Sequence, residues 1–369
     1  MTAKLFIKKN AITIIAFLAA LITVFFVPID KEYVNYFDYK TLVCLFCVLA
    51  VVCALKNINF FYLLAHRIVQ LFKNTRICVL ALIYITFIGS MLIANDMALL
   101  TFLPLGYFVL TSTDKKKYMA FTFIMQNIAA NLGGMLTPFG NPQNLYLYSY
   151  FAIDNIEFVK IMLLPFIFAI VLITVFCIIF VKKEPLKIEG TVEKLNRKKG
   201  ILYLLLFALS IAIVFRGIPY IVGLVVIPTV LLFVDRKALK QVDYSLLLTF
   251  VFFFVFSGNM ARIEVVKNFF SALLEKNTFL VSVLSCQVIS NVPSAILLSQ
   301  FTSNYVDLLL GVNIGGVGTI ISSLASLITF REYVKHNPEK GFYYIERFSA
   351  YNFLFLIALV GFVLLLKMI

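Results

Sequence analysis

Residues 93–97 read Ile-Ala-Asn-Asp-Met, and residues 289–293 read Ile-Ser-Asn-Val-Pro. Each run places an asparagine within a long apolar part of the chain. Three further pairs of segments match in the same order: Asp38-Tyr39-Lys40 with Asp243-Tyr244-Ser245, Lys73-Asn74 with Lys276-Asn277, and Asn131-Leu132-Gly133-Gly134 with Asn313-Ile314-Gly315-Gly316. In chain order the offsets between partners are 205, 203, 196 and 182 residues. Because the order holds and polar residues match, the chain is predicted to contain two repeats.

The composition around these runs is that of a membrane protein. Of the 369 residues, 62% are apolar and only 14% are charged, whereas about a quarter are charged in a soluble domain. Apolar stretches of 17 residues or more recur between Ala11 and Leu366, each long enough to cross about 30 Å of hydrocarbon. These stretches are continuous rather than alternating, which predicts helices and not a barrel. The expected fold class is an all-α polytopic membrane protein, and soluble enzymes and DNA-binding proteins are excluded.

The net charge of +14 follows the loops. Of the 32 Lys and Arg residues, 24 lie on alternate connections, at residues 4–9, 56–76, 115–117, 182–199, 236–240 and 331–347. By the positive-inside rule these connections face the cytoplasm. The sequence therefore predicts a multi-pass protein of the inner (cytoplasmic) membrane, surrounded by lipid bilayer, with a cytoplasmic N-terminus and an external C-terminus.

The length of the segment after Asn95-Asp96 predicts how it enters the membrane. Met97–Leu110 has 14 residues, which reach about 21 Å as a helix and are too few to cross. Its flanks, Arg76 and Lys115–Lys117, are both basic. Residues 77–110 are therefore predicted to form a re-entrant hairpin from the cytoplasm, with Asn95-Asp96 at its tip.

A matching hairpin with Ser290-Asn291 at its tip is predicted in the second repeat. Each repeat then has four crossings, and one additional helix between the repeats inverts the second. The expected organisation is a first repeat at 1–181 (helices about 11–29, 39–55 and 158–181, hairpin 77–110, broken helix 119–150), a cytoplasmic linker at 182–199, a linker transmembrane helix at 200–216, and a second repeat at 217–369 (helices about 219–234, 244–260 and 348–366, hairpin 278–302, broken helix 306–330). Inverted repeats with broken helices are typical of secondary transporters.

The hairpin tips carry the candidate chemistry. Asp96 is the only acidic residue expected deep in the apolar region, where a carboxylate is costly to bury. It is therefore expected to face protein, water or a cation, or to be protonated, or to cap the second hairpin arm. Asn95 and Asn291 offer amide oxygens and N–H donors where helix ends leave backbone groups unpaired.

The broken helices supply the rest of the predicted site. Residues 137–144 read Thr-Pro-Phe-Gly-Asn-Pro-Gln-Asn, and four glycines interrupt residues 311–318. Such breaks free carbonyls for cations and N–H groups for anions, although the glycines of the second break also suit close helix packing. The candidate substrate- and cation-binding residues are Asn95, Asp96, Thr137, Gly140, Asn141, Asn144, Ser290, Asn291, Thr319, Ser322 and Ser323. Sodium is expected near Asn95, Asp96 and Asn141, and near Asn291 and Ser322.

Four stretches resemble the motifs of a known family: IANDMALL at 93–100, TPFGNPQNL at 137–145, ISNVP at 289–293 and GVNIGGVGTIISSLASL at 311–327. They are similar to the hairpin-tip and broken-helix motifs of the ion transporter superfamily. That superfamily includes citrate and other divalent-anion/sodium symporters, arsenite/antimonite efflux permeases and certain sodium/proton antiporters. The resemblance implies a scaffold domain, a transport domain that carries both hairpins and both broken helices, an elevator-type mechanism and a homodimer.

The resemblance also implies roles for the tip residues. Each tip of the dicarboxylate symporters carries Ser-Asn-Thr, so Asn95 and Asn291 correspond to the Asn between cation and substrate, and Asp96 replaces a substrate-binding Thr. A charged Asp96 would repel a dianion. The Ala-Asn-Asp tip and the Ser-Leu-Ala-Ser stretch favour the arsenite-permease branch, although no Cys is expected near either tip.

The expected function is secondary active transport of a small anion, a carboxylate or an oxyanion, coupled to sodium or protons. An arsenite/antimonite efflux permease and a sodium/proton antiporter are the alternatives. A channel would need a continuous polar pore, and an intramembrane aspartyl protease would need a second deep carboxylate beside Asp96. The chain is thus expected not to be an enzyme, to need no cofactor besides transported or coupling Na⁺ or H⁺, and to bind no nucleic acid.

Overall fold

A computed structural model describes residues 11–186 and 196–368. Within these residues the regular elements are helices, apart from one antiparallel bridge between Asn74 and Pro185. The predicted cytoplasmic N-terminus and half of the predicted 182–199 linker, residues 187–195, lie outside the described residues.

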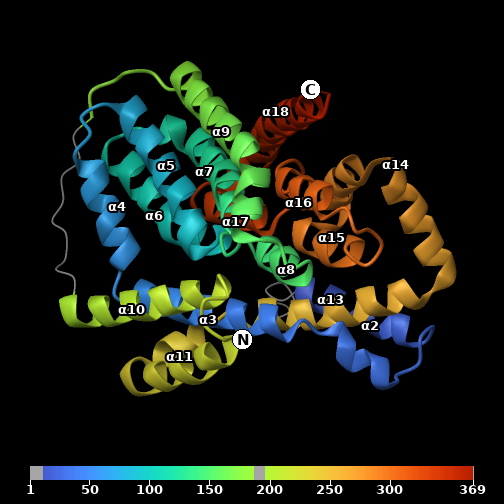
Figure 1. Cartoon of the computed structure of the whole chain (residues 1–369). Coiled ribbons are helices and arrows are strands. Elements are labelled where there is room, and N and C mark those ends of the chain that lie inside the picture. Colours follow the sequence, from blue (N-terminus) through green and yellow to red (C-terminus); the bar gives the residue numbers. More distant parts are fainter. Residues whose placement is uncertain (1–10, 187–195, 369) are drawn as a thin grey trace.

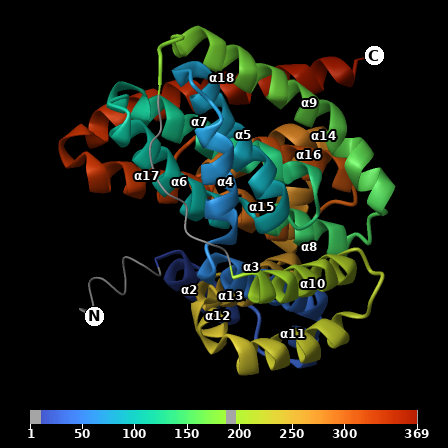
Figure 2. The same ribbon diagram turned by 90° about the vertical axis from the view of Figure 1, so that its left-hand side faces the viewer.

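The helices form two layers (Figures 1 and 2). One layer contains α2 (Ala11–Val24), α3 (Tyr39–Asn57), α10 (Arg197–Val214), α11 (Tyr220–Val234), α12 (Arg236–Gln241) and α13 (Tyr244–Arg262). The other contains α5 (Thr75–Ile93), α6 (Asn95–Ser112), α7 (Met119–Gly133), α8 (Pro142–Tyr150), α9 (Asn155–Phe180), α15 (Asn291–Leu298), α16 (Tyr305–Ile314), α17 (Leu324–His336) and α18 (Gly341–Leu366). Two helices connect the layers, α4 (Phe60–Gln70) and α14 (Glu264–Ile289).

Six of the described helices are long and apolar enough to cross a membrane: α3, α5, α9, α13, α14 and the helix of residues 338–366 that includes α18. Three shorter apolar helices are α2, α11 and α16. Many large apolar side chains of α9 and α18 are exposed, as is typical of lipid-facing surfaces. The chain is therefore a multi-pass helical membrane protein.

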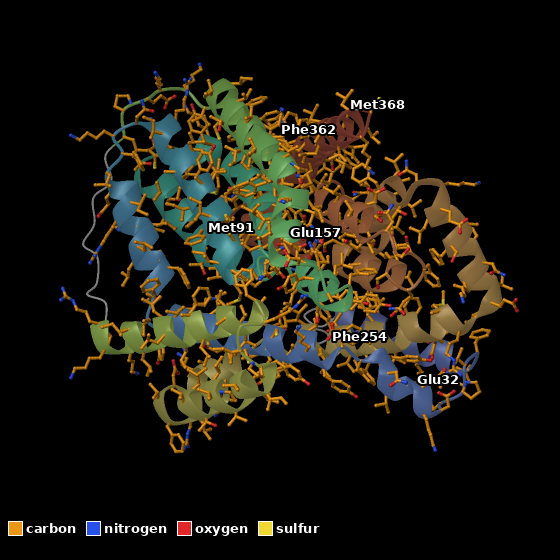
Figure 3. The ribbon with its side chains drawn as sticks, viewed as in Figure 1. Glu32, Met91, Glu157, Phe254, Phe362 and Met368 are labelled. Carbon is orange, nitrogen blue, oxygen red and sulfur yellow. The ribbon has the colours of Figure 1, made fainter. Side chains whose placement is uncertain are left out.

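The layers contact each other through aromatic side chains. Tyr146 of α8 lies against Phe254 of α13, with ring centroids 5.6 Å apart; Phe254 is labelled in Figure 3. Behind this contact, all 15 residues of α7 are buried. The end of α7 therefore positions its polar residues in the interior of the protein.

Some helix bounds differ from those predicted. The first helix ends at Val24 rather than near residue 29, because Pro28 disfavours helical backbone in the residue before it. The second hairpin arm, α6, has 18 residues instead of 14 and reaches about 27 Å. A helix of this length is compatible with a re-entrant arm and with a crossing helix, so re-entry stays a prediction.

Matching residues begin the corresponding helices of the two halves. The Asp38 carboxylate accepts a hydrogen bond from Thr41 N at 3.0 Å and caps α3. The Asp243 carboxylate accepts one from Leu246 N at 3.0 Å and caps α13. These aspartates are the pair with the offset of 205 residues.

The pair with the offset of 203 residues is equivalent as well. α14 bends at Asn277, whose φ of −167° and ψ of 90° are not helical. The Asn277 side chain accepts a hydrogen bond from Leu280 N at 2.9 Å and caps the second limb of α14, residues 278–289. The Asn74 side chain caps α5 in the same way, with Arg76 N at 2.9 Å. The two halves thus share local structure, and the inversion of one relative to the other stays a prediction.

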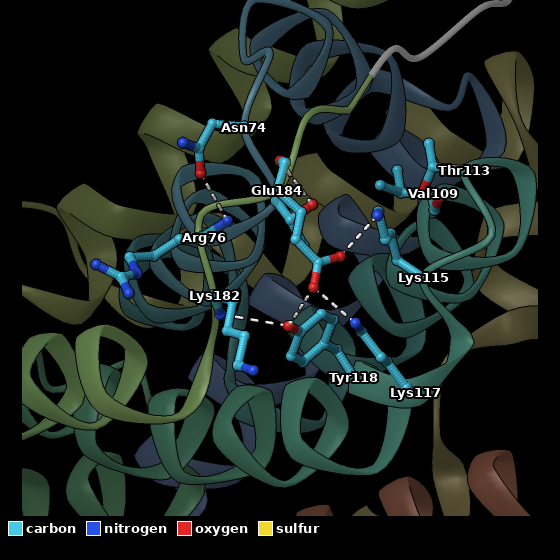
Figure 4. Close-up of polar contacts among 10 residues, drawn as sticks. Asn74, Arg76, Val109, Thr113, Lys115, Lys117, Tyr118, Lys182 and Glu184 are labelled. Carbon is cyan, nitrogen blue, oxygen red and sulfur yellow. Dashed lines mark hydrogen bonds and ion pairs between the residues drawn. The ribbon is translucent and has the colours of Figure 1, made fainter.

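The segment after α9 is tied to the start of α5 and to the turn that precedes α7 (Figure 4). The Glu184 carboxylate accepts hydrogen bonds from Lys115 Nζ at 2.7 Å and Lys117 Nζ at 2.6 Å. Its backbone carbonyl accepts one from Thr75 N at 2.9 Å. The hydrogen bonds from Lys115 and Lys117 lower the pKa of Glu184 to about 2.

This cluster predicts a pH-dependent effect on stability. Glu184→Gln is expected to lower the melting temperature at neutral pH, because the carboxylate favours the folded state while it is ionised. A lowered pKa gives a contribution that is complete above the ordinary value of 4.5 and is lost as pH falls toward about 2. Melting curves of the wild type and the variant should therefore converge over that interval. A difference that persists at the acidic end would mean that packing, not charge, causes it.

Candidate functional site

Both hairpin tips have strained backbone. Ala94, between α5 and α6, has φ 65° and ψ 151°, and Ser290, between α14 and α15, has φ 76° and ψ 159°. This region of backbone conformation is nearly restricted to glycine and costs about 1–3 kcal/mol for other residues. Two such residues at equivalent positions indicate that the surrounding structure holds the tips in place.

The contacts that hold the tips come from the breaks. Asn95 N donates a hydrogen bond to Gly140 O at 3.1 Å, and Asn291 N donates one to Ser322 O at 2.9 Å. The tip residues are 196 positions apart and the break residues are 182 positions apart. These are the offsets of the repeat, so each tip meets its own break through the same bond.

A second bond joins each hairpin to its break. Thr137 Oγ1 donates to Met91 O at 2.8 Å (Met91 is labelled in Figure 3). Thr319 Oγ1 donates to Gln287 O at 3.0 Å. The two predicted threonines therefore join hairpin to break, and both hydroxyl groups donate their hydrogen bonds to backbone carbonyls of the protein.

Buried amides join the two breaks to each other. Asn95 Nδ2 donates to Asn131 Oδ1 at 3.2 Å. Asn141 Nδ2 lies 3.2 Å from both Asn131 O and Asn313 Oδ1. Asn313 Nδ2 in turn donates to Asn144 Oδ1 at 2.6 Å. Asn131 on α7 and Asn313 on α16 are matched asparagines of the predicted repeats, so this amide cluster links the two halves of the chain.

The second tip reaches the same cluster. A Cβ atom at Gly316 would lie 3.0 Å from Asn291 Nδ2 and 3.6 Å from Asn131 Oδ1. The missing side chain of Gly316 thus leaves room for both amides. Asn95 and Asn291 thus both lie near Asn131, one from each tip.

Two buried oxygens of the first break, Asn141 Oδ1 and Gln143 Oε1, have no hydrogen-bond partner in the described structure, and neither has Asp96 Oδ1 at the first tip. An unpartnered buried acceptor is rare and costs about 1–3 kcal/mol. A cation or an added proton would satisfy such oxygens. Among the described residues, no three His, Cys, Asp or Glu side chains come together as a metal site, so a cation here would rely mainly on neutral oxygens.

The predicted site residues fall into two contacting groups and two outliers. The first group is Asn95, Thr137, Gly140, Asn141 and Asn144, and the second is Ser290, Asn291, Thr319 and Ser322. Ser323 caps α17 through Ala325 N at 3.3 Å. Asp96 is half-buried at the start of α6, where its backbone N donates to Asn95 Oδ1 at 2.9 Å.

Sequence reasoning missed several residues of the site. Asn131, Asn313, Gln143 and Gln287 were not proposed, although the matched Asn-x-Gly-Gly runs contained the first two. The expectation that no Cys lies near a tip is wrong, because Cys286 contacts the second break: a Cβ atom at Gly315 would lie 2.9 Å from its Sγ. Cys286 is four residues before the tip, on the helical face that turns toward α16.

Two tips between helices that meet two interrupted helices in a buried polar centre of a multi-pass helical protein are typical of membrane transporters. The chain belongs to the citrate transporter family, whose family model matches residues 3–306. This confirms the resemblance to the ion transporter superfamily. Proteins of this family are transporters rather than enzymes, which implies a small-molecule substrate and a bilayer environment.

Relatives fit the same assignment. The chain is 35% identical to an uncharacterized transporter of Methanocaldococcus jannaschii over 80% of this chain and 81% of that protein. It is 27% identical to the inner membrane protein YbiR of Escherichia coli over 92% and 91% of the two chains. A putative transporter, arsB, of Dictyostelium discoideum is 23% identical over 45% of this chain and 29% of its own length.

Proposed function

We propose that the protein is a secondary active transporter that moves a small anion, a carboxylate or an oxyanion, across the cell membrane. Transport is coupled to sodium or protons and follows an elevator-type alternating-access mechanism. In this proposal the layer of α2, α3 and α10–α13 is the scaffold domain, and the layer with both tips and both breaks is the transport domain. α4 and the first part of α14 are the connections across which the transport domain moves.

One observation carries the proposal of an anion. Four helices begin around the amide cluster: α6 at Asn95, α15 at Asn291, α8 at Pro142 and α17 at Leu324. The hydrogen bonds between tips and breaks keep these starts together. A helix N-terminus presents unpaired N–H groups and the positive end of the helix dipole, which together favour a negative ligand.

The coupling cation is assigned to the first break. Asn141 Oδ1 and Asp96 Oδ1 are buried acceptors without donors, and Gly140 O lies close to the former, since a Cβ atom at Gly134 would be 2.4 Å from Asn141 Oδ1 and 2.7 Å from Gly140 O. Sodium or a proton at these oxygens would compensate the charge of Asp96. The anion and the cation would then enter one neutral loaded site.

Uptake into proteoliposomes tests the proposal. Citrate, succinate, sulfate, phosphate and arsenite would be offered under an imposed sodium gradient, an imposed proton gradient or neither. We expect one carboxylate or oxyanion to accumulate only with a gradient. Accumulation of arsenite alone would instead support the arsenite/antimonite permease. Sodium-for-proton exchange without any anion would support the antiporter.

The orientation and assembly belong to the same proposal. We infer a homodimer in the inner membrane with a cytoplasmic N-terminus and an external C-terminus. The six cysteines are free and buried, so an added surface cysteine should be the main reactive thiol. Lys116→Cys should react only from the cytoplasmic side and Asn155→Cys only from outside, and the reverse pattern would overturn the orientation.

A further inference from the structure

Gln287, on the second limb of α14, inserts its side-chain amide into the second break. Gln287 Nε2 donates to Gly315 O at 2.8 Å and also lies 3.1 Å from Val283 O of its own helix and 3.4 Å from Val317 O. Gln287 Oε1 accepts a hydrogen bond from Thr319 N at 2.9 Å. A single side chain therefore satisfies the Gly315 carbonyl and the Thr319 N–H group of the break, and its second N–H is shared between Val283 O and Val317 O.

The loop of the second break is shaped around this amide. Gly318 has a φ of +138°, a conformation that residues with side chains rarely adopt. A Cβ atom there would lie only 2.1 Å from Gln287 Oε1. Both the backbone conformation and the limited space at this position thus require glycine. Because Gly318 has no side chain, the loop can lie in close contact with the Gln287 amide.

Other donors use the remaining oxygens of the second break. Ser322 Oγ lies 2.9 Å from Gly316 O and 2.7 Å from Thr319 O. Ser322 O accepts the backbone N–H of Asn291. The buried side-chain oxygen without a partner near this break is Ser326 Oγ, a hydroxyl that can itself donate. Few acceptors are left for a cation.

The first break is different at the equivalent position. With the offset of 196 residues, Gln287 corresponds to Met91, whose thioether has no hydrogen to donate. Three carbonyls of the first break, those of Gly134, Met135 and Thr137, share one amide nitrogen, Asn144 Nδ2, at 3.2 to 3.3 Å. The unpartnered oxygens of Asn141 and Gln143 lie at this break, and that of Asp96 lies at its tip. Of the two breaks, the first therefore has the unpartnered amide oxygens.

We propose that the Gln287 amide takes the place of a cation at the second break, so that the transporter couples to a single cation per chain, bound at the first break. The Nε2 group donates to the Gly315 oxygen and lies beside that of Val317, where a second sodium ion would need both oxygens as ligands. This inference rests on the proposed cation coupling. It replaces the second sodium site that the sequence predicted near Asn291 and Ser322.

Gln287→Glu tests the inference. The new carboxylate retains one oxygen for Thr319 N and turns the other toward two carbonyl oxygens, where it needs a cation in between. The ratio of sodium bound per purified full-length chain is measured by calorimetric titration with sodium chloride against choline chloride, at neutral and alkaline pH. We expect the ratio to double, from one in the wild type to two in the variant.

Two further variants make the comparison specific. Met91→Gln adds a donor at the first break and is expected to remove the sodium ion that the wild type binds. Gln241→Glu adds the same charge as Gln287→Glu at the exposed end of α12 and should leave the ratio at one. Melting curves of all variants report whether each protein is folded.

The outcomes separate this inference from the proposed function. Two sodium ions on the wild type, or an unchanged ratio in a folded Gln287→Glu protein, would overturn the role of Gln287. If the wild type binds no sodium, the sodium form of the coupling fails. Sodium binding by Gln287→Glu alone would then still support the role of Gln287, and binding by neither protein would overturn it.

Discussion

Replacement of Asp96 by Asn is expected to abolish gradient-driven transport while the protein remains folded in the membrane. The Asp96 carboxylate has one buried oxygen without a partner. A bare carboxylate resists movement through a low-dielectric barrier, whereas a carboxylate paired with a cation or a proton passes more easily. Coupling arises from this difference. A bare carboxylate in the membrane interior costs about 2.5–3.5 kcal/mol more than a neutralised one, so loss of this coupling should reduce driven uptake by about 100-fold.

Proteoliposome uptake under sodium or proton gradients measures this effect, and Asp114→Asn is the matched control. Asp114 lies in the exposed turn after α6 and has a φ of 56°, which asparagine tolerates well. The control should transport normally. Full driven uptake by Asp96→Asn, together with its loss in Asn95→Ala and Asn291→Ala, would show that Asp96 is a structural residue and that neutral oxygens hold the coupling ion.

Asn313→Ala is expected to destabilise the protein and to stop transport. Asn313 is buried, accepts a hydrogen bond from Asn141 Nδ2 and donates to Asn144 Oδ1. Its removal leaves both partners buried without their bond across the two halves, at about 1–3 kcal/mol each. Transport should fall even at temperatures where the protein is folded, because Asn141 and Asn144 then lose their positions at the first break.

Asn352→Ala controls for the loss of a buried amide as such. Asn352 of α18 donates to Phe348 O of its own helix at 2.9 Å, and its Oδ1 has no partner. This substitution should change stability little and leave uptake intact. Melting temperatures and initial uptake rates of both variants are the measurements. Equal behaviour of Asn313→Ala and Asn352→Ala would mean that the amide link between the breaks is unimportant.

The local pattern of the sequence predicted where helices begin and break. Asp38, Asn74 and their repeat partners are caps, and a cap is recognisable because its side chain bonds within the next few residues. The prolines and glycines of residues 137–142 likewise act on their own backbone. These signals are short in range, so a single sequence contains them in full.

The contacts across the site could not be predicted in this way. Asn141 and Asn313 are 172 positions apart, and no local rule pairs two particular amides at that distance. Gln287 appeared to be an ordinary residue of an apolar arm, because its role depends on a loop that passes beside it. The predicted arm was two residues short at each end of α6, because Asn95 and Asp96 were assigned to the hairpin tip and the polar residues Thr111 and Ser112 were excluded from the apolar run.

The strained tips have a consequence for how the site opens. Ala94 and Ser290 keep their unfavourable backbone only while the breaks hold Asn95 N and Asn291 N. When a tip separates from its break, the lost hydrogen bond is partly offset by relaxation of that backbone. Each tip therefore stores backbone strain while the site is closed. Release of this strain lowers the free-energy cost of opening the site.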